Sequence, residues 1–184
     1  AGLPLAGLTA YQALRRLNVG SGQTVLIHAA AGGVGALGVQ LAHAFGARVI
    51  GTASERNHAF LAELGAEPVS YGEGLADRVR ELAPDGVDAA VDFVGGEEAV
   101  EVSRQVTKDP ARVGSIADAG VVEYGGRYMW VRPSAEDLTE LGKLADAGTL
   151  TVHVDRTYPL VEAAVAWRVS QAGNVRGKLV LTVG

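Results

Sequence analysis

A doubly wound α/β fold with a mainly parallel, six-stranded sheet is predicted by three features of the sequence. Short apolar runs rich in β-branched residues alternate with amphipathic, helix-like stretches. Glycine closes several of these stretches, as is common at a helix C-terminus. A run of small residues joins the first strand-like run to the next helix-like stretch. Alternating strands and helices form right-handed crossovers, which place parallel strands side by side with helices on both faces.

The first 150 residues account for the six-stranded core. A helix over residues 5–17 comes first, with Leu8, Tyr11 and Leu14 on one face. The predicted strands cover residues 24–29, 48–53, 67–71, 87–94, 112–117 and 127–131. The predicted helices after the first cover residues 34–45, 55–66, 75–84, 96–105 and 134–147. The first strand is apolar almost throughout, which is typical of a strand covered on both faces.

The pattern changes after Gly148. Residues 151–184 are here called the C-terminal unit. The strand-like run "LTVHVDRTYPL" (150–160) leads into it, and "GKLVLTV" follows a predicted helix over 161–171. A six-stranded sheet does not require these two strands. The C-terminal unit is therefore expected to be separate from the dinucleotide-type core of residues 1–150.

The composition excludes several classes of protein. The 184 residues are 48% hydrophobic with a formal net charge of −5, which suits one large domain with a sizeable core. Acidic and basic residues are interspersed, without the basic stripe typical of nucleic-acid binding or a membrane surface. No apolar run approaches the length of a membrane span. The chain has no cysteine, which excludes disulfides and thiolate metal sites and favours a reducing, cytoplasmic location.

The small-residue run "HAAAGGVGALGVQ" (28–40) carries the strongest functional signal. It matches a dinucleotide-binding glycine motif as Ala30-x-Gly32-x-x-Gly35, with alanine in place of the first glycine. The first position permits the sharp turn, Gly32 allows a pyrophosphate to lie against bare backbone, and Gly35 allows close helix–strand packing. The phosphates then meet free N–H groups at the positive end of the helix dipole. The alternative is a tight turn that serves packing alone.

The end of the second predicted strand indicates which dinucleotide is bound. An NAD site usually has Asp or Glu there, to accept a hydrogen bond from the ribose 2′-hydroxyl. In this chain Ala53 takes that place, Ser54 can donate a hydrogen bond, and Arg56 can pair with a 2′-phosphate. NADPH is therefore favoured. Two alternatives remain: Glu55 reaches the ribose by a different backbone path, or Arg56 is an ordinary surface arginine.

No acid–base or metal-binding constellation stands out. The four histidines are scattered without metal-ligand spacing, and His28 is expected to be buried and hydrogen-bonded. Asp88 and Asp92 bracket the fourth predicted strand, where a carboxylate often caps a loop. Ser115 lacks the elbow motif of a hydrolase. We expect no metal site, and the sequence identifies no catalytic residue.

The chain resembles the cofactor-binding lobe of a medium-chain dehydrogenase/reductase, in the zinc-free quinone oxidoreductase branch. The segments "PLAGLTAYQAL", "GQTVLIHAAAGGVG", "ARVIGTAS", "DFVGG", "VGSIA" and "GKLVLTV" follow the order and spacing of that family. The resemblance covers essentially the whole chain. It implies NADPH-dependent reduction of a quinone, an enone or a related activated alkene. "TKDPARVGS" departs from the family, which usually has a glycine-rich turn before the fifth strand.

The resemblance also implies a set of cofactor-binding residues. The residues implied for the pyrophosphate are Gly32, Gly33, Val34 and Gly35, and those for the 2′-phosphate are Ser54, Arg56 and Tyr71. The residues implied for the adenosine end are Val94 and Gly95, and those for the nicotinamide ribose are Ser115, Ile116 and Ala117. The segment implied to border the nicotinamide, and to pair edge to edge in family dimers, comprises Met129, Trp130 and Val131. A basic group near the C-terminus that reaches the cofactor is implied at Lys178.

Members of this family normally begin with a barrel-like lobe, which supplies part of the active-site cleft. The 184 residues contain no counterpart, so we expect the chain to be an excised domain or a proteolytic remnant, with the two late strands normally associated with that lobe. A homodimer through the sixth-strand edge is also expected. Two alternative functions stay open: an enoyl-thioester reductase of fatty-acid or polyketide type, and a nucleotide-binding module without turnover.

Overall fold

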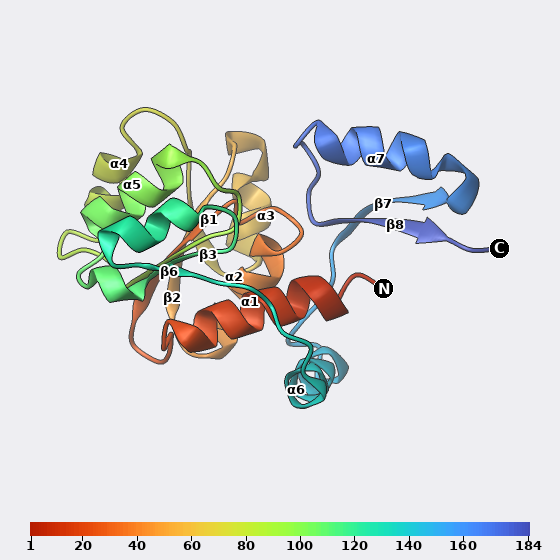
Figure 1. Cartoon of the computed structure of the whole chain (residues 1–184), viewed down its shortest axis with the longest axis horizontal. Coiled ribbons are helices and arrows are strands. Elements are labelled where there is room, and N and C mark those ends of the chain that lie inside the picture. The colour runs from red at the N-terminus through yellow and green to blue at the C-terminus, as the bar shows by residue number, and fades with distance from the viewer.

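One parallel sheet forms the centre of the computed structural model, which describes all 184 residues (Figure 1). The strand order is β3-β2-β1-β4-β5-β6. The strands are β1 (Thr24–His28), β2 (Arg48–Thr52), β3 (Ala66–Val69), β4 (Ala89–Asp92), β5 (Val113–Ser115) and β6 (Arg127–Tyr128). This is the order of a doubly wound dinucleotide-binding fold. The predicted six-stranded Rossmann fold is confirmed, and no barrel-like lobe lies within these residues.

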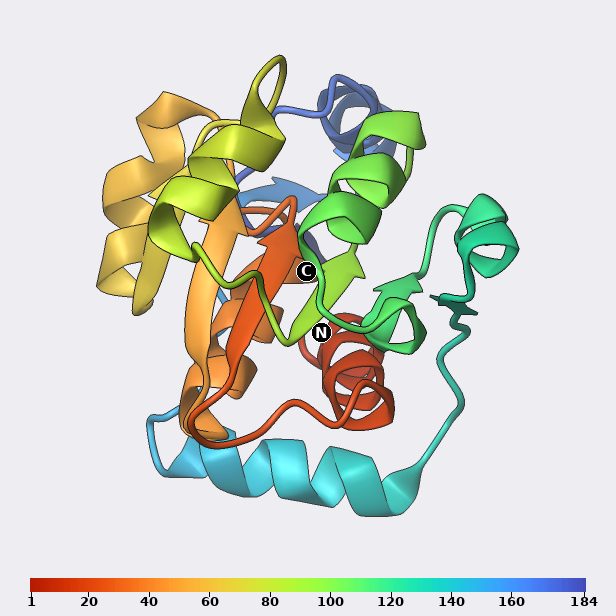
Figure 2. The same ribbon diagram turned by 90° about the vertical axis from the view of Figure 1, so that its left-hand side faces the viewer.

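Helices cover both faces of the sheet, because side chains alternate along each strand. Val25 and Ile27 join a core cluster with one set of helices, whereas Leu26 joins a second cluster on the opposite face. The first set comprises α1 (Pro4–Arg16), α2 (Gly35–Ala44) and α3 (His58–Glu63), and the second comprises α4 (Leu75–Leu82) and α5 (Glu97–Val106). α6 (Ala135–Asp146) packs against α1 and lies across the bottom of the molecule in Figure 2. No helix combines the length and apolar character needed to cross a bilayer.

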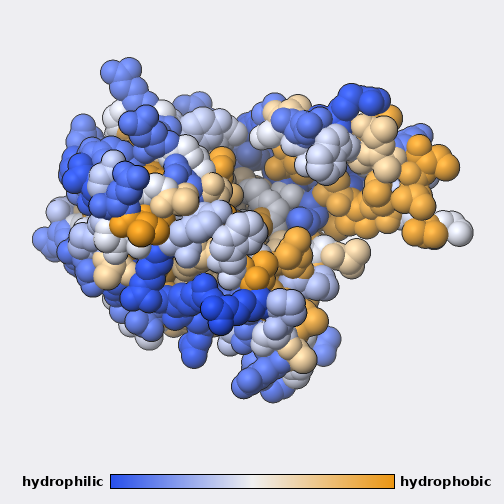
Figure 3. All heavy atoms as spheres, viewed as in Figure 1, coloured by the Kyte–Doolittle hydropathy of each residue, from blue (hydrophilic) through white to orange (hydrophobic).

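The C-terminal unit stands beside this sheet (Figure 1). β7 (Val154–Pro159), α7 (Ala163–Gln171) and β8 (Lys178–Thr182) form a strand–helix–strand unit whose two strands pair in parallel. Figure 3 shows apolar residues gathered over this unit. The large hydrophobic side chains exposed on it include Leu160, Val161, Trp167, Leu181 and Val183. Nothing within the 184 residues covers them.

Several elements differ from the predicted boundaries. β6 ends at Tyr128, three residues before the predicted end, because the chain turns towards α1, where Gln12 Oε1 accepts the Arg132 N–H (2.9 Å). The predicted helix at 55–66 begins as a 3₁₀ turn, η1 (Glu55–Asn57), and only then becomes α3. β4 ends at Asp92, whose side chain accepts hydrogen bonds from the N–H groups of Val94 and Gly95 in the following loop.

Candidate functional site: the glycine turn and two adjoining cavities

The glycine turn, residues 29–35, connects β1 to α2. Ala29 has a φ of +52°, so the chain changes direction immediately after the strand. A Cβ on Gly35 would overlap the Ala29 carbonyl oxygen and lie 2.7 Å from Ala30 Cα. Only glycine therefore fits at Gly35, and the reason is the packing of α2 against the end of β1.

Gly32 is different, because the fold itself barely requires glycine there. A Cβ on Gly32 would have one neighbour within 4 Å, the Ala29 carbonyl oxygen at 3.2 Å, and a shift of a few tenths of an ångström would restore an ordinary contact. Its φ does not lie in the left-handed region. Gly32 borders both cavities described below. The bare backbone at Gly32 thus faces open space that a ligand can occupy.

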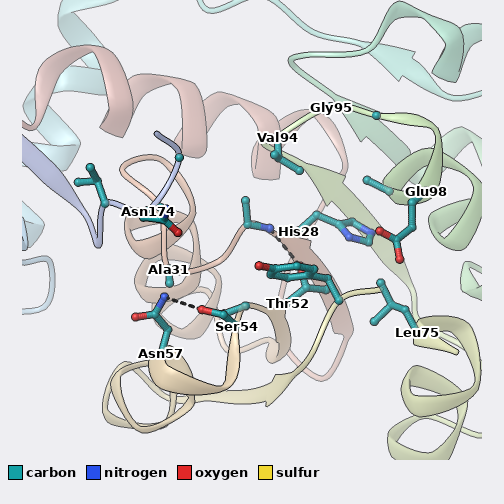
Figure 4. Close-up of a pocket in the computed structure, with 18 of the residues that line it drawn as sticks. His28, Ala31, Thr52, Ser54, Asn57, Leu75, Val94, Gly95, Glu98 and Asn174 are labelled. Atoms are coloured by element: carbon teal, nitrogen blue, oxygen red, sulfur yellow. Dashed lines mark hydrogen bonds between the residues drawn. The ribbon is translucent and has the colours of Figure 1, made fainter. Parts of the chain in front are cut away.

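The first cavity, of about 450 Å³, lies at the carboxyl ends of β1, β2 and β4 (Figure 4). β1 and β4 are neighbours in the sheet although three helices separate them in the chain. This is the topological switch point, where open α/β sheets bind ligands. The residues at the strand ends that line the cavity are His28, Ala29, Thr52, Ala53, Val94 and Gly95.

The turn after β2 forms one wall of the first cavity. Ser54, Arg56 and Asn57 line it, and Asn57 Nδ2 donates to Ser54 Oγ (3.4 Å; Figure 4). Arg56 forms no ion pair; its Nη2 donates instead to Asn174 Oδ1 (2.9 Å). Glu55 does not line the cavity. The positive charge of Arg56 therefore stands at the rim without a carboxylate partner.

Tyr71 completes the rim, on the loop between β3 and α4. Its side chain is 59% exposed. Arg78 of α4 donates from Nε and Nη2 to the Ser70 carbonyl oxygen (3.1 and 2.8 Å) and from Nη1 to that of Glu73 (2.8 Å). From the other side, Glu98 Oε1 accepts the Gly72 N–H (2.8 Å). These bonds hold the loop in shape, and the sequence patterns did not identify them.

A buried carboxylate shapes the loop after β4. Asp92 is 1% exposed and accepts hydrogen bonds from the N–H groups of Val94 (2.8 Å) and Gly95 (2.9 Å). The Ser115 hydroxyl donates to Asp92 Oδ2 (2.7 Å) and accepts from the N–H groups of Ala117 and Asp118. Asp92 is thus a loop cap, and the Ser115 hydroxyl is fully occupied by the protein.

His28 forms part of the floor of the first cavity and is 2% exposed. Its Nε2 lies 3.0 Å from the buried Ser103 hydroxyl. Burial lowers the pKa of His28 to about 4, and the nearby Asp92 carboxylate offsets this only in part. His28 is therefore a neutral, hydrogen-bonded residue at neutral pH, and it contributes no charge to the cavity.

The other side of the glycine turn meets the C-terminal unit. A Cβ on Gly33 would lie 2.7 Å from Lys178 Cδ and 2.9 Å from the Gly177 carbonyl oxygen. The Gly177 N–H donates to the Ala31 carbonyl oxygen (2.9 Å). A second cavity, also of about 450 Å³, opens here. Its lining includes Gly32, Gly33, Val34, Gly35 and Lys178.

The structure brings most of the site residues expected from the sequence to these two cavities. The first cavity is lined by Gly32, Ser54, Arg56, Tyr71, Val94 and Gly95. Ser115, Ile116, Ala117 and Trp130 line neither cavity. Ile116 and Trp130 border a separate small pocket against α1, and Trp130 is 69% exposed. Asn57, Leu75 and Asn174 line the first cavity but were not singled out from the sequence.

The comparisons with known proteins agree with this geometry. A family model described as a zinc-binding dehydrogenase matches residues 64–181. A probable quinone oxidoreductase from Leishmania amazonensis is 38% identical over 144 residues, covering 76% of this chain and 42% of that protein. The quinone oxidoreductase structure from Coxiella burnetii superposes with a TM-score of 0.87 at 39% identity, over 100% of this chain and 60% of its own. The chain belongs to the medium-chain dehydrogenase/reductase superfamily. It corresponds to the cofactor-binding lobe.

Proteins described in other terms are also similar to this chain. A polyketide synthase, GfsB of Streptomyces halstedii, is 34% identical over 100% of this chain and 4% of that protein. An NAD-dependent alcohol dehydrogenase from Sulfolobus acidocaldarius is 31% identical over 98% of this chain and 56% of its own length. A mycobacterial structure complexed with NADPH has a TM-score of 0.82 at 30% identity, over 96% of this chain and 62% of its own. The chain thus spans at most about three-fifths of the length of these proteins.

The description of the matching family model names zinc. Zinc is usually bound by clusters of His, Cys, Asp and Glu side chains. No group of three or more His, Cys, Asp or Glu side chains that could hold a metal ion occurs in the 184 residues.

Proposed function

We propose that the chain is the NADPH-binding domain of an oxidoreductase that transfers hydride to a quinone, an enone or a related activated alkene. The observation that carries this proposal is the bare backbone at Gly32, at the carboxyl edge of the sheet between two cavities. A Cβ at Gly35 would overlap protein backbone, whereas a Cβ at Gly32 would meet a single oxygen at 3.2 Å and otherwise face open space. A diphosphate against the backbone gives the reason for the second glycine.

The choice of NADPH over NADH rests on the wall of the first cavity. Ala53 provides no carboxylate for a ribose 2′-hydroxyl, and Ser54 presents a hydroxyl beside Arg56. The Arg56 guanidinium binds a neutral amide oxygen, so its charge is available to a 2′-phosphate. The carboxylate of Glu98 lies across the cavity from Ser54 and Asn57 (Figure 4). A dianionic phosphate is therefore favoured on the Arg56 side.

The residues of this chain would bind and orient the cofactor. The hydride itself is supplied by NADPH when it is bound, so the protein's task is to position two reactants and exclude water. Gly32, Gly33 and the α2 N-terminus would receive the diphosphate, with the Lys178 ammonium beside them in the second cavity. The buried, neutral His28 forms the floor beneath the adenosine end and takes no proton.

The substrate would be held partly by residues outside this chain. The exposed apolar face of the C-terminal unit would pack against a barrel-like lobe in the whole protein, since large exposed apolar surfaces mark interaction sites. A homodimer would form through the edge next to β6, where Trp130 is exposed. Sedimentation of the whole protein tests the dimer, and a strictly monomeric profile at high concentration contradicts it.

An enoyl-thioester reductase is the second candidate. The similarity to GfsB over the whole of this chain supports it, and the cofactor lobe has the same task in either enzyme. Turnover of quinones, enones and a short enoyl thioester by the whole protein separates the two candidates. Absence of turnover with every acceptor, together with tight cofactor binding, would leave a nucleotide-binding module without turnover.

Titration of the 184-residue chain with NADPH and NADH, followed by cofactor fluorescence, tests the proposed binding function. NADPH is expected to bind more tightly. Arg56→Ala should weaken NADPH by about 1.5–3 kcal/mol, the range for hydrogen bonds to charged groups, and leave NADH nearly unchanged. Arg168→Ala is the matched control, because Arg168 is exposed on α7 outside both cavities. Equal losses for both cofactors in Arg56→Ala would show that Arg56 does not contact the 2′-phosphate.

A further inference from the structure

The connector between α7 and β8, residues 172–177, reaches the turn after β2 from the opposite end of the chain. Asn174 Oδ1 accepts from Arg56 Nη2 (2.9 Å), across 118 residues of sequence. Arg176 Nε donates to Asn57 Oδ1 (3.0 Å), and its Nη2 donates to the Arg56 carbonyl oxygen (3.3 Å). The connector therefore holds both the side chain and the backbone of the Arg56 turn.

The same connector also lines the first cavity. Gly173, Asn174 and Val175 are among the lining residues. Figure 4 shows Asn174 on the same side of the cavity as Ser54 and Asn57. The connector then continues to the glycine turn, where the Gly177 N–H meets the Ala31 carbonyl oxygen. One stretch of chain thus links the place proposed for the 2′-phosphate to the place proposed for the diphosphate.

The chemistry of the contact matters as much as its geometry. Arg56 and Arg176 form no ion pair with any carboxylate. Arg176 instead lies over the Phe60 ring, 5.2 Å from its centroid. Asn174 binds Arg56 through an amide oxygen, which orients the guanidinium without neutralising it. Asn174 Nδ2 donates to the Ala172 carbonyl oxygen (3.0 Å), and this bond fixes the amide with its oxygen towards Arg56. An aspartate at this position would still accept from Arg56, but it would lose the bond to Ala172, offset the charge of Arg56 and repel a phosphate.

We propose that Asn174 is a positioning residue that sets selectivity for the 2′-phosphate of NADPH by orienting Arg56 with a neutral acceptor. This inference rests on the proposed function, because it refines the same cofactor site. Arg176 supports the arrangement by holding the η1 backbone. The C-terminal unit thereby takes part in cofactor selection, although it lies outside the six-stranded sheet.

The test uses the 184-residue chain and two probes that carry no nicotinamide, adenosine 2′,5′-bisphosphate and 5′-AMP. Asn174→Asp keeps the shape of the side chain and adds one negative charge near Arg56. It should weaken the bisphosphate about tenfold, because the new carboxylate competes for the guanidinium and repels the phosphate. Binding of 5′-AMP should change less than twofold. Asn174→Ala removes the side-chain acceptor of Arg56 without adding charge and leaves only the longer contact from Arg56 Nη2 to the carbonyl oxygen of residue 174 (3.4 Å). It should weaken the bisphosphate about threefold.

Gln171→Glu is the control, since it adds the same charge to an exposed position at the end of α7, outside both cavities. It should leave both affinities within twofold. A loss in Asn174→Asp that is equal for the two probes, or no loss at all, overturns the role of Asn174. If Arg56→Ala still loses the bisphosphate selectively, the proposed function survives that result. If the unmodified chain binds neither probe nor NADPH, the proposed function fails as well.

Discussion

Alanine substitutions at Gly32 and Gly35 should separate a glycine kept for a ligand from a glycine kept for the fold. At Gly35 the new Cβ meets backbone atoms of Ala29 and Ala30, which cannot rotate away. Overpacking of this kind costs up to about 3 kcal/mol, and the better helix propensity of alanine returns about 1 kcal/mol. The net loss of about 2 kcal/mol should lower the Tm of a chain of this size by about 4–8 °C.

At Gly32 the expected result is the reverse. The single contact at 3.2 Å needs only a small adjustment, and alanine reduces the entropy of the unfolded chain by an amount worth about 0.4–1 kcal/mol. The Tm should therefore move by less than about 2–4 °C, the shift expected for 1 kcal/mol. NADPH affinity should fall at least about tenfold, or about 1.4 kcal/mol, because the methyl group occupies the proposed diphosphate position.

Thermal unfolding by circular dichroism and NADPH titration, performed on both variants, check these two outcomes. The decisive comparison is the pattern across the pair, since either variant alone has several explanations. Undiminished NADPH affinity in Gly32→Ala would refute the assignment of the turn to the diphosphate. A Tm loss in Gly32→Ala as large as that in Gly35→Ala would show that both glycines serve packing.

Two further predictions concern the buried polar groups at the strand ends. Because the pKa of His28 falls from 6.5 in the unfolded chain to about 4 in the folded one, the unfolded state binds more protons between these values. The effect of His28 on the free energy of unfolding should thus be constant above about pH 6.5, and this free energy should decline by up to about 3 kcal/mol as the pH falls towards 4. Urea unfolding measured across this pH range checks the prediction. An equally steep decline in His28→Gln would contradict it. Asp92→Ala leaves the N–H groups of Val94 and Gly95 without their acceptor and should cost about 2–4 kcal/mol. Asp85→Ala, in an exposed turn, serves as its control, and a cost for Asp92→Ala below about 1 kcal/mol would show that the loop does not depend on this cap.

Local patterns were sufficient to predict the sheet, its helices and the glycine turn. The β-branched runs, the amphipathic stretches and the glycines each act within a few residues or one crossover, and chirality restricts how such units can be joined. Ser54 and Arg56 could be assigned from the end of the second predicted strand, whereas Tyr71, Val94 and Gly95 were implied by the family resemblance. Each follows a parallel strand closely, and the carboxyl ends of parallel strands meet at one edge of the sheet.

Contacts between distant segments could not be predicted in this way. The Asn174–Arg56 hydrogen bond joins residues 118 positions apart and depends on how the C-terminal unit sits beside the sheet. Nothing in the sequence indicated that the Ser115 hydroxyl donates to Asp92, a contact that exists because β4 and β5 are neighbours in the sheet. The different reasons for Gly32 and Gly35 also became visible only when the surrounding atoms were placed. The sequence shows only that each position lacks a side chain. The tertiary structure shows whether the space beside the glycine is filled by protein atoms, as at Gly35, or is open to a ligand, as at Gly32.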